Sequence, residues 1–284
     1  MKFTVLGSGG NTPTPLPTCD CRVCLEARRE GVPYARRGNA IYLHDERALI
    51  DAPELVWETL NRQQIGEVEY VFLSHFHADH TLGLRALQAF GLEDPPVESF
   101  VGEVPTLVMS ERTRELAVEA NEVLAHLTET WADTRVLADG ERLTLGDLSV
   151  THLAAPIEPD GPDDVSAFLF EDGESVALVS PDENRHLPLD RLPPLDLWIK
   201  ECGYFRETPA GELLVTERAE ETSLAHELSF AESLEQIRAV EPDRVVLTEL
   251  EELYRRSYDD YERLAARHEE LALSFAHDGL ELAV

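Results

Sequence analysis

The stretch that decides the fold is Ser74–His80, "SHFHADH", which follows directly on the apolar run "EYVFL" at 69–73. Four of its seven residues can bind a metal ion: His75, His77, Asp79 and His80. A buried strand followed by such a turn places several donors at the carboxyl end of the strand, where ligands gather in α/β architectures. Imidazoles suit zinc or iron and carboxylates suit harder ions, so the mixed set predicts a site for two divalent metals. One metal, or a polar turn without metal, are the alternatives.

Strand-like and helical patterns alternate along the whole chain, which indicates an α/β fold. Short β-branched or aromatic runs predict strands at 2–6, 39–43, 48–50, 70–73, 106–109, 148–153, 167–170, 176–179, 197–200, 244–247 and 271–275. Helical periodicity predicts helices at 55–61, 82–90, 112–127, 230–240 and 258–270. With no internal repeat and no linker composition, we predict a single domain over residues 1–284.

The net charge is unusual: 56 acidic side chains against 24 basic ones give −32. Such a charge repels phosphate backbones, which disfavours nucleic acid as a partner. A cationic partner would explain it, but the acidic residues are spread along the chain and form no tail. We therefore favour the alternative of a halophilic protein, whose carboxylates keep it hydrated in a salt-rich cytoplasm.

The chain has no run of 18 apolar residues, and its amino-terminal stretch "MKFTVLGSGG" leads into a strand pattern instead of a signal peptide. We expect a soluble cytoplasmic protein with no membrane partner.

The His-x-His-x-Asp-His motif resembles the hallmark of the metallo-β-lactamase superfamily. The resemblance implies a four-layer αββα sandwich, with His75 and His77 on one metal and Asp79 and His80 on the other. Asp51, in "ALIDAP", matches an acidic residue that supports the histidines in that family. This role is physically reasonable, because a ligating imidazole needs an acceptor for its other N–H.

A second cluster lies in "TCDCRVCLEARR", which holds Cys19, Cys21 and Cys24. Three closely spaced cysteines in an intracellular chain rarely form disulfides and more often bind zinc, which needs a fourth ligand. A reactive thiol group, or small buried residues, are the alternatives. Cys202, alone in an apolar strand, is more typical of a core residue.

The cysteine cluster and "LGSGGNTP" at 6–13 together resemble the branch that contains phosphoribosyl cyclic phosphodiesterase (PhnP). In that branch a Cys-x-Cys-x-x-Cys triplet and a distant His bind a structural zinc, and the resemblance places His226 in that role. The similarity continues through "YARRGNAIYL", "DLWIKECGY", "DRVVLTEL" and "HDGLEL", so it covers nearly the whole chain.

The later ligand motifs of the superfamily are altered in this sequence. After "LSVTHLAAPIEPD" the expected His is missing, because His152 comes too early, within the strand pattern. The position of the bridging Asp aligns with Pro181, which leaves Asp182 one place late, with His186 nearby. Glu249 stands where the family has a final His, and a carboxylate can also bind a divalent metal. Four loop carboxylates are candidates to replace the missing His: Glu158, Asp160, Asp163 and Asp164.

Three hypotheses of function remain. The first is a metal-dependent hydrolase of a small (cyclic) phosphodiester, in which a metal-bound hydroxide attacks phosphorus and Asp79 and Asp182 are catalytic ligands. Its cofactors are one or two Zn²⁺ or Mn²⁺ at the main site, held by His75, His77, Asp79, His80, Asp182 and Glu249, besides a structural Zn²⁺. The second is a non-hydrolytic or biosynthetic factor with a degenerate site, as in pyrroloquinoline quinone biosynthesis protein B. The third is a tRNA 3′-processing nuclease, which the negative charge disfavours.

The partner predicted by the first hypothesis is a small-molecule phosphate ester. Arg36 and Arg37 precede the second predicted strand, where family members also carry Arg, and arginine can bind phosphate through two hydrogen bonds. A solvated surface pair is the alternative. The oligomeric state stays open, with a homodimer as one option.

Overall fold

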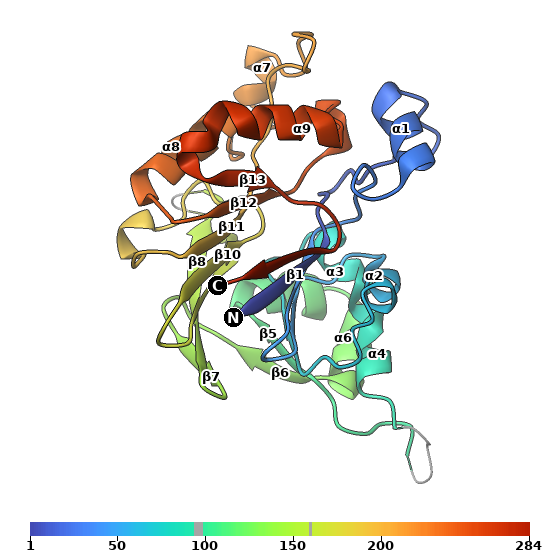
Figure 1. The fold of residues 1–284 in the computed structure, drawn as a ribbon. Helices are drawn as coiled ribbons and strands as arrows, with labels where there is room; N and C mark the ends of the chain where they lie inside the picture. The colour runs from blue at the N-terminus through green and yellow to red at the C-terminus, as the bar shows by residue number, and fades with distance from the viewer. Residues whose placement is uncertain (94–98, 159–160) are drawn as a thin grey trace.

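The computed structural model describes residues 1–93, 99–158 and 161–284, and they form two seven-stranded sheets packed face to face (Figure 1). Each sheet carries helices on its outer face, which confirms the predicted four-layer αββα sandwich.

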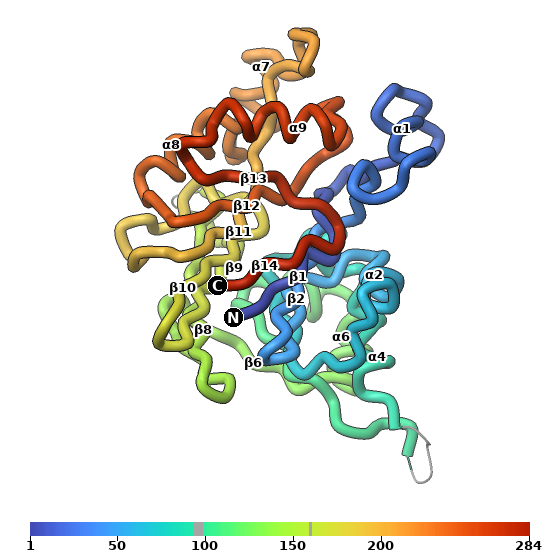
Figure 2. The backbone as a smooth tube through the Cα atoms, viewed as in Figure 1, coloured from blue at the N-terminus to red at the C-terminus, as the bar shows by residue number. Residues whose placement is uncertain are grey.

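The first sheet has the strand order β14-β1-β2-β3-β4-β5-β6. Its strands are β1 (Lys2–Gly7), β2 (Ala40–Leu43), β3 (Ala48–Ile50), β4 (Tyr70–Phe72), β5 (Thr106–Met109), β6 (Asp133–Val136) and β14 (Leu280–Ala283). Strands β3 to β6 run parallel to one another, while β1 pairs antiparallel with both β2 and β14. The pairing of β1 with β14 brings the two ends of the chain side by side, as Figure 2 shows.

The second sheet has the order β13-β12-β11-β10-β9-β8-β7. Its strands are β7 (Arg142–Leu145), β8 (Leu148–Pro156), β9 (Asp164–Glu171), β10 (Val176–Ser180), β11 (Leu197–Glu201), β12 (Val245–Thr248) and β13 (Leu273–Phe275). Strands β10 to β13 are parallel, so the residues that follow β10, β11 and β12 emerge at one edge of the sheet.

Three apolar clusters hold the layers together. Between the sheets, Phe72 of β4 meets Phe168 of β9 edge to face, with ring centroids 5.1 Å apart. The outer face of the first sheet packs against α2 (Val56–Arg62), α4 (Leu87–Phe90) and α6 (Glu122–Trp131). The outer face of the second packs against α8 (Phe230–Val240) and α9 (Tyr258–Ala265). Burial on both faces explains why the central strands are apolar without alternation.

The remaining helices connect these elements. They are α1 (Arg22–Glu30), α3 (Ala78–Thr81), η1 (Leu82–Ala86), α5 (Glu111–Thr113), the π-helix η2 (Arg114–Glu119), η3 (Leu189–Arg191), α7 (Glu217–Glu220), η4 (Glu252–Tyr254) and η5 (Ala266–Leu271). Within the described ranges, none of the helices combines the length and apolar character needed to cross a membrane.

The predicted strands are all present, with ends displaced by up to three residues, but three further strands were not predicted. These strands, β6, β7 and β14, expose at least half of their residues and lack a continuous apolar run. The single helix predicted at 112–127 is wrong. Asn121 accepts hydrogen bonds from the backbone N–H groups of Val123 and Leu124, so it ends one helix and caps the next.

Candidate metal centre

The Ser74–His80 motif leaves the carboxyl end of β4 and turns into α3, which begins after His77. This turn points all three imidazoles at one another: His75 Nε2 lies 2.8 Å from His77 Nδ1, and the rings of His75 and His80 are 4.3 Å apart. Asp79 Oδ2 lies 3.4 Å from His80 Nε2. His75 and His80 are fully buried. The motif is therefore a compact donor set inside the protein.

Asp51 and Ser74 fix the orientation of two of these rings. Asp51 follows β3 and is buried, and its Oδ2 lies 2.8 Å from His80 Nδ1. The same carboxylate accepts hydrogen bonds from the backbone N–H and the hydroxyl of Ser74, whose Oγ lies 3.0 Å from His75 Nδ1. The structure thus places Asp51 behind the histidines, where its carboxylate leaves each Nε2 facing inward.

Two carboxylates from the second sheet complete the arrangement. Asp182, after β10, places Oδ2 3.2 Å from His75 Nε2 and 3.4 Å from His80 Nε2. Glu249, after β12, places Oε1 3.9 Å from His80 Nε2. Although both residues depart from the family pattern in sequence, the structure brings them to the motif, and Asp182 lies between its two halves.

Glu183 is a member of the site that the sequence did not reveal. Donor atoms of His75, His77, Asp182 and Glu183 lie within 4.8 Å of one another, and those of Asp79, His80 and Glu249 form a second such group. Glu183 has a φ of +37°, so the chain turns sharply after Asp182 instead of continuing as a strand. Asp51 and Glu249 also have positive φ, at 61° and 57°. Strained backbone at the ends of strands is common at functional sites.

The described loop carboxylates that could replace the missing His do not join the site. Asp163 pairs with Arg112, and Asp164 accepts a hydrogen bond from Ser110. Asp160 lies outside the described residues. Glu158, His152 and His186 are also absent from the donor groups found among the described residues. The ring of His152 bonds instead with Ser166 and with the carbonyl oxygen of Ala138.

The donor set fits divalent metal ions. Because His80 Nδ1 faces Asp51, His80 Nε2 presents a lone pair to carboxylate oxygens, and it has no hydrogen-bond partner among the described residues. Glu249 Oε1 is buried and unpartnered within the same described part of the chain. Lone pairs that face one another in a buried site need a cation between them.

In the metal-free chain protons supply that charge. Burial would lower the pKa of His80, but the charge of Asp51 and the nearby carboxylates of Asp182 and Asp79 raise it well above its ordinary value. Burial and the charge of Asp182 raise the pKa of Glu249. Seven nitrogen and oxygen donors in two groups are suited to Zn²⁺ or Mn²⁺ in place of these protons.

The structure brings the three cysteines together, but the fourth residue of the cluster is Glu252 and not His226. Donor atoms of Cys19, Cys21, Cys24 and Glu252 lie within 4.8 Å of one another, and Glu252 is fully buried. Glu252 Oε1 is 2.9 Å from Cys21 Sγ and 3.1 Å from Cys24 Sγ, while its Oε2 has no partner among the described residues. Three thiols and a buried carboxyl fit a structural zinc.

His226 lies elsewhere, which corrects the assignment made from the sequence. Its ring is about half exposed, and Nε2 is 3.3 Å from Glu158 Oε1. The position before α8 resembles the family pattern along the chain but does not approach the thiols. Cys202 is a buried core residue, as predicted.

Arg36 and Arg37 do not point into the site, which corrects their predicted role in phosphate binding. Arg36 is 2% exposed and donates to Thr14 Oγ1 and to the carbonyl oxygens of Leu250 and Arg256. Arg37 pairs with Asp278 and Glu58. Their donors hold neighbouring loops together.

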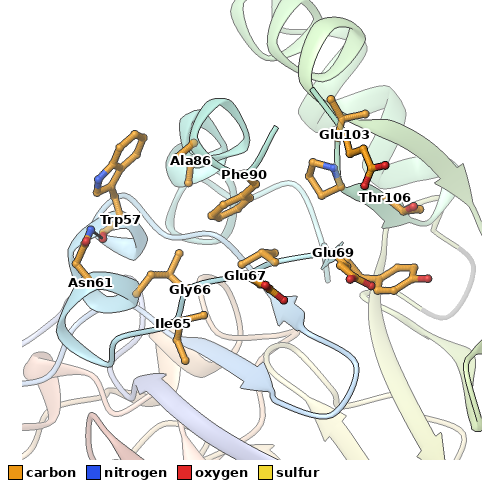
Figure 3. Close-up of a pocket in the computed structure, with 16 residues that line it drawn as sticks. Trp57, Asn61, Ile65, Gly66, Glu67, Glu69, Ala86, Phe90, Glu103 and Thr106 are labelled. Atoms are coloured by element: carbon orange, nitrogen blue, oxygen red, sulfur yellow. Dashed lines mark hydrogen bonds between the residues drawn. The ribbon is translucent and has the colours of Figure 1, made fainter. Parts of the chain in front are cut away.

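A cavity of about 700 Å³ opens over the metal centre. His77, Asp79, Asp182 and Glu249 line it, together with aromatic and aliphatic side chains such as Tyr204. A cavity of about 750 Å³ lies between α2, α4 and the segments 65–70 and 103–106 (Figure 3). Its described lining includes Trp57 and Phe90 but no histidine or cysteine, so we assign the chemistry to the first cavity.

Comparison with known proteins identifies the family. The sequence model described as the beta-lactamase superfamily domain matches residues 47–248, which is more than half of the chain and includes the motif, Asp182 and the strand before Glu249. The chain belongs to the metallo-β-lactamase superfamily. Most members of this superfamily are metal-dependent hydrolases. No curated protein matches the chain by sequence.

Solved metallo-β-lactamase folds resemble the chain over its full length. A diphosphatase of the PhnP family is 20% identical, covers 100% of this chain and 97% of its own, and has a TM-score of 0.71. Zn²⁺-bound PqqB from Methylobacterium extorquens is 19% identical with both chains fully covered and a TM-score of 0.72. The short form of human tRNase Z is 14% identical, with 100% and 99% coverage and a TM-score of 0.63. At these identities the likeness establishes the fold alone.

Proposed function

We propose that the chain is a metal-dependent hydrolase of small phosphodiesters, with its active site at the Ser74–His80 motif. One observation carries the proposal: Asp182 Oδ2 lies 3.2 Å from His75 Nε2 and 3.4 Å from His80 Nε2. A single carboxylate thus stands between two donor groups, as a centre with two neighbouring metals requires. The structural relatives that include a diphosphatase and a tRNase support phosphorus–oxygen chemistry.

The residues of the chain have distinct tasks in this proposal. His75, His77, Asp182 and Glu183 would hold one metal, and Asp79, His80 and Glu249 the other. Bound there, such ions lower the pKa of water and stabilise negative charge on phosphoryl oxygens. Asp51 and Ser74 keep Nε2 of each ring directed inward, so that little reorganisation is needed when the substrate binds.

The cavity wall positions the substrate. Phe205, Leu224 and Tyr204 offer an apolar face for the organic part of an ester. Arg255 is the one arginine or lysine among the described lining residues, but its guanidinium pairs with Glu252. Recognition of the phosphate must therefore depend on the metal centre more than on basic side chains.

The test is turnover of bis(p-nitrophenyl) phosphate by purified protein with saturating Mn²⁺ or Zn²⁺. We expect the wild type to release p-nitrophenol and the H77A variant to lose this activity. The imidazole ring of His77 is one of the four donors of the first group, and alanine removes it. Activity of the wild type no higher than that of H77A would exclude phosphodiester hydrolysis.

A second candidate is a non-hydrolytic factor of the kind suggested by the similarity to PqqB. The acidic cavity wall favours it, since carboxylates repel an anionic substrate. Metal counting separates the two: about two metals per chain beyond the cysteine-bound zinc support the hydrolase, whereas one or none supports the factor. The acidic wall also disfavours an RNA substrate.

We further propose a cytoplasmic location and a small-molecule partner. Cys19, Cys21 and Cys24 are free thiols grouped around Glu252, and a reducing compartment keeps such thiols available for zinc. A halophilic origin would explain the net charge of −32.

A further inference from the structure

The turn that carries Asp182 sets the direction of its carboxylate. The backbone N–H of Glu183 donates to Asp182 Oδ1 over 2.9 Å. Asp182 Oδ2 is then the oxygen that faces His75 and His80. Glu183 makes its contact with a φ of +37°, a conformation that costs free energy in a residue other than glycine. Such backbone persists only where the surrounding structure holds it, so other residues must hold this turn.

Asn184, the next residue of the turn, is bound to the end of strand β11. Its backbone N–H and its Nδ2 donate to Glu201 Oε2 over 3.3 and 2.8 Å. Lys200 donates from Nζ to Asn184 Oδ1 over 2.7 Å. Because an ammonium group can only donate, the amide oxygen of Asn184 must face Lys200 and its NH₂ must face Glu201. The side chain of Asn184 therefore has one orientation.

Lys200 contributes to this network at a cost in stability. It is fully buried, and Nζ has one further acceptor, the carbonyl oxygen of Glu201 at 3.3 Å. Within the described part of the chain it forms no ion pair with a carboxylate. A buried ammonium group without an ion pair is expensive, and an apolar side chain of similar volume would avoid the expense. The contact with Asn184 explains a lysine here better than stability does.

Two further contacts hold the turn from other layers of the fold. Asn39, before β2, donates from Nδ2 to the carbonyl oxygen of Pro181 over 3.3 Å. Gln236 on α8 donates to the carbonyl oxygen of Asn184 over 3.1 Å. The turn is thus bound to the first sheet, to β11 and to the helix layer. These contacts use backbone and amide groups, so Asp182 Oδ2 is left for the metal centre.

We propose that Lys200, acting through Asn184 and Glu201, positions the carboxylate of Asp182 for metal binding. The inference rests on the metal centre of the proposed function, which the non-hydrolytic alternative shares. A turn that is already in place spares the reorganisation that a loose turn would need when metal binds. Lys200 is a positioning residue, because it is fully buried and is absent from the described lining of the cavity.

The test is the Mn²⁺ affinity of the main centre, measured by equilibrium dialysis, because thiols bind Mn²⁺ poorly. K200M keeps a long side chain and removes the donors. We expect its Mn²⁺ affinity to fall at least about tenfold, as it does when supporting groups are changed. The melting temperature of the metal-free protein should stay near that of the wild type. The matched control K2M changes a partly exposed lysine that pairs with Glu281, and it should bind Mn²⁺ as the wild type does.

The N184A variant separates positioning from a direct effect of the lysine charge. If Lys200 acts through the amide of Asn184, N184A should lose Mn²⁺ affinity to a similar extent. The double variant K200M/N184A should then lose no more than either single variant, because both break one network. Wild-type affinity in N184A, or losses that add in the double variant, would overturn the inference.

The Q236M variant covers the case in which K200M or N184A fails to fold. Gln236 is less buried than either residue and holds the same turn from α8. We expect a several-fold loss of Mn²⁺ affinity in Q236M and none in E235M, which changes an exposed neighbour on the same helix. Wild-type affinity in K200M, or in Q236M where K200M does not fold, would overturn the inference. The hydrolase proposal would still stand, because it is tested by turnover and these measurements use binding alone.

Discussion

The two sheets contribute opposite chemistry to the metal centre. The first supplies all three imidazoles from one turn, whereas the second supplies only carboxylates, from segments after β10 and β12 that are far apart in sequence. In the first, Asp51 and Ser74 hold His75 and His80 in place.

Two of the carboxylates from the second sheet lack such support. Glu183 Oε2 and Glu249 Oε1 are buried without a hydrogen-bond partner among the described residues. One half of the centre is therefore organised by the protein, and the other half relies on a cation to satisfy it.

The largest effect is expected from D182N, which breaks the connection between the halves. Asp182 contacts donors of both groups, so loss of its charge weakens both metal sites. We expect turnover of bis(p-nitrophenyl) phosphate to fall at least about a hundredfold. D163N, which alters an ion pair on the surface, is the matched control. Unchanged turnover in D182N would place the reaction elsewhere.

The D51N variant tests the support that Asp51 gives to the histidines of the first sheet. An amide in place of the carboxylate can present its NH₂ group to His80 Nδ1 and so disturb the ring. Changes at such supporting groups cost roughly 10- to 100-fold in metal affinity. Competition with a chelator would measure the loss, and an affinity equal to that of the wild type would contradict the proposed role of Asp51.

The cysteine site should respond independently of both halves. C24S should remove about one zinc per chain and lower the melting temperature, because zinc binding to such a site contributes to folding. The control C202A changes the other buried cysteine, which lies in the core, and should keep its zinc. Elemental analysis decides, and full zinc content in C24S would rule out the site.

The buried carboxyl groups of the second sheet should make the stability of the metal-free protein depend on pH. Burial raises the pKa of Glu183 to about 7 and that of Glu201 to about 8, so the folded state holds protons that the unfolded state has released. The free energy of unfolding should therefore decrease as pH rises from about 5 to 8. Denaturant titrations with and without Mn²⁺ measure it. A free energy that increases with pH in the absence of metal would contradict these protonation states.

The smallest effect is expected from E249H, which replaces a carboxylate of the metal centre with an imidazole. The added nitrogen donor should shift metal preference from Mn²⁺ toward Zn²⁺ several-fold, with the fold unchanged. Competition between the two ions, read by elemental analysis, measures the shift. E251H, at a neighbour that bonds Thr12, is the control. An unchanged ratio in E249H would indicate that Glu249 does not bind the metal.

The sequence predicted the layered fold and the motif because both depend on short-range patterns. The histidines of the motif are neighbours along the chain, and the central strands are marked by apolar runs. The edge strands β6 and β7 carry no such run, so they were missed.

The rest of the site depends on turns that no sequence pattern predicts. In an extended strand, Asp182 and Glu183 would point to opposite sides, and only the positive φ of Glu183 brings both inward. Histidine is the more usual zinc ligand, which favoured His226 in the sequence. In the structure, however, Glu252 is the residue that lies beside the cysteines. Arg36 was chosen for its charge, and its donors turned out to be used by backbone carbonyls.

The segment from Glu249 to Glu252 shows how tightly the two sites are joined. Its first residue faces the main centre, Glu251 binds the backbone N–H of Thr12, and its last residue meets the cysteines. The Leu250 N–H donates to Ser8, and Arg36 holds the Leu250 carbonyl. No residue is spare, so an insertion or deletion here would misplace both ends at once. Substitution can alter the chemistry of this segment, whereas a change of length would displace donors of two sites together.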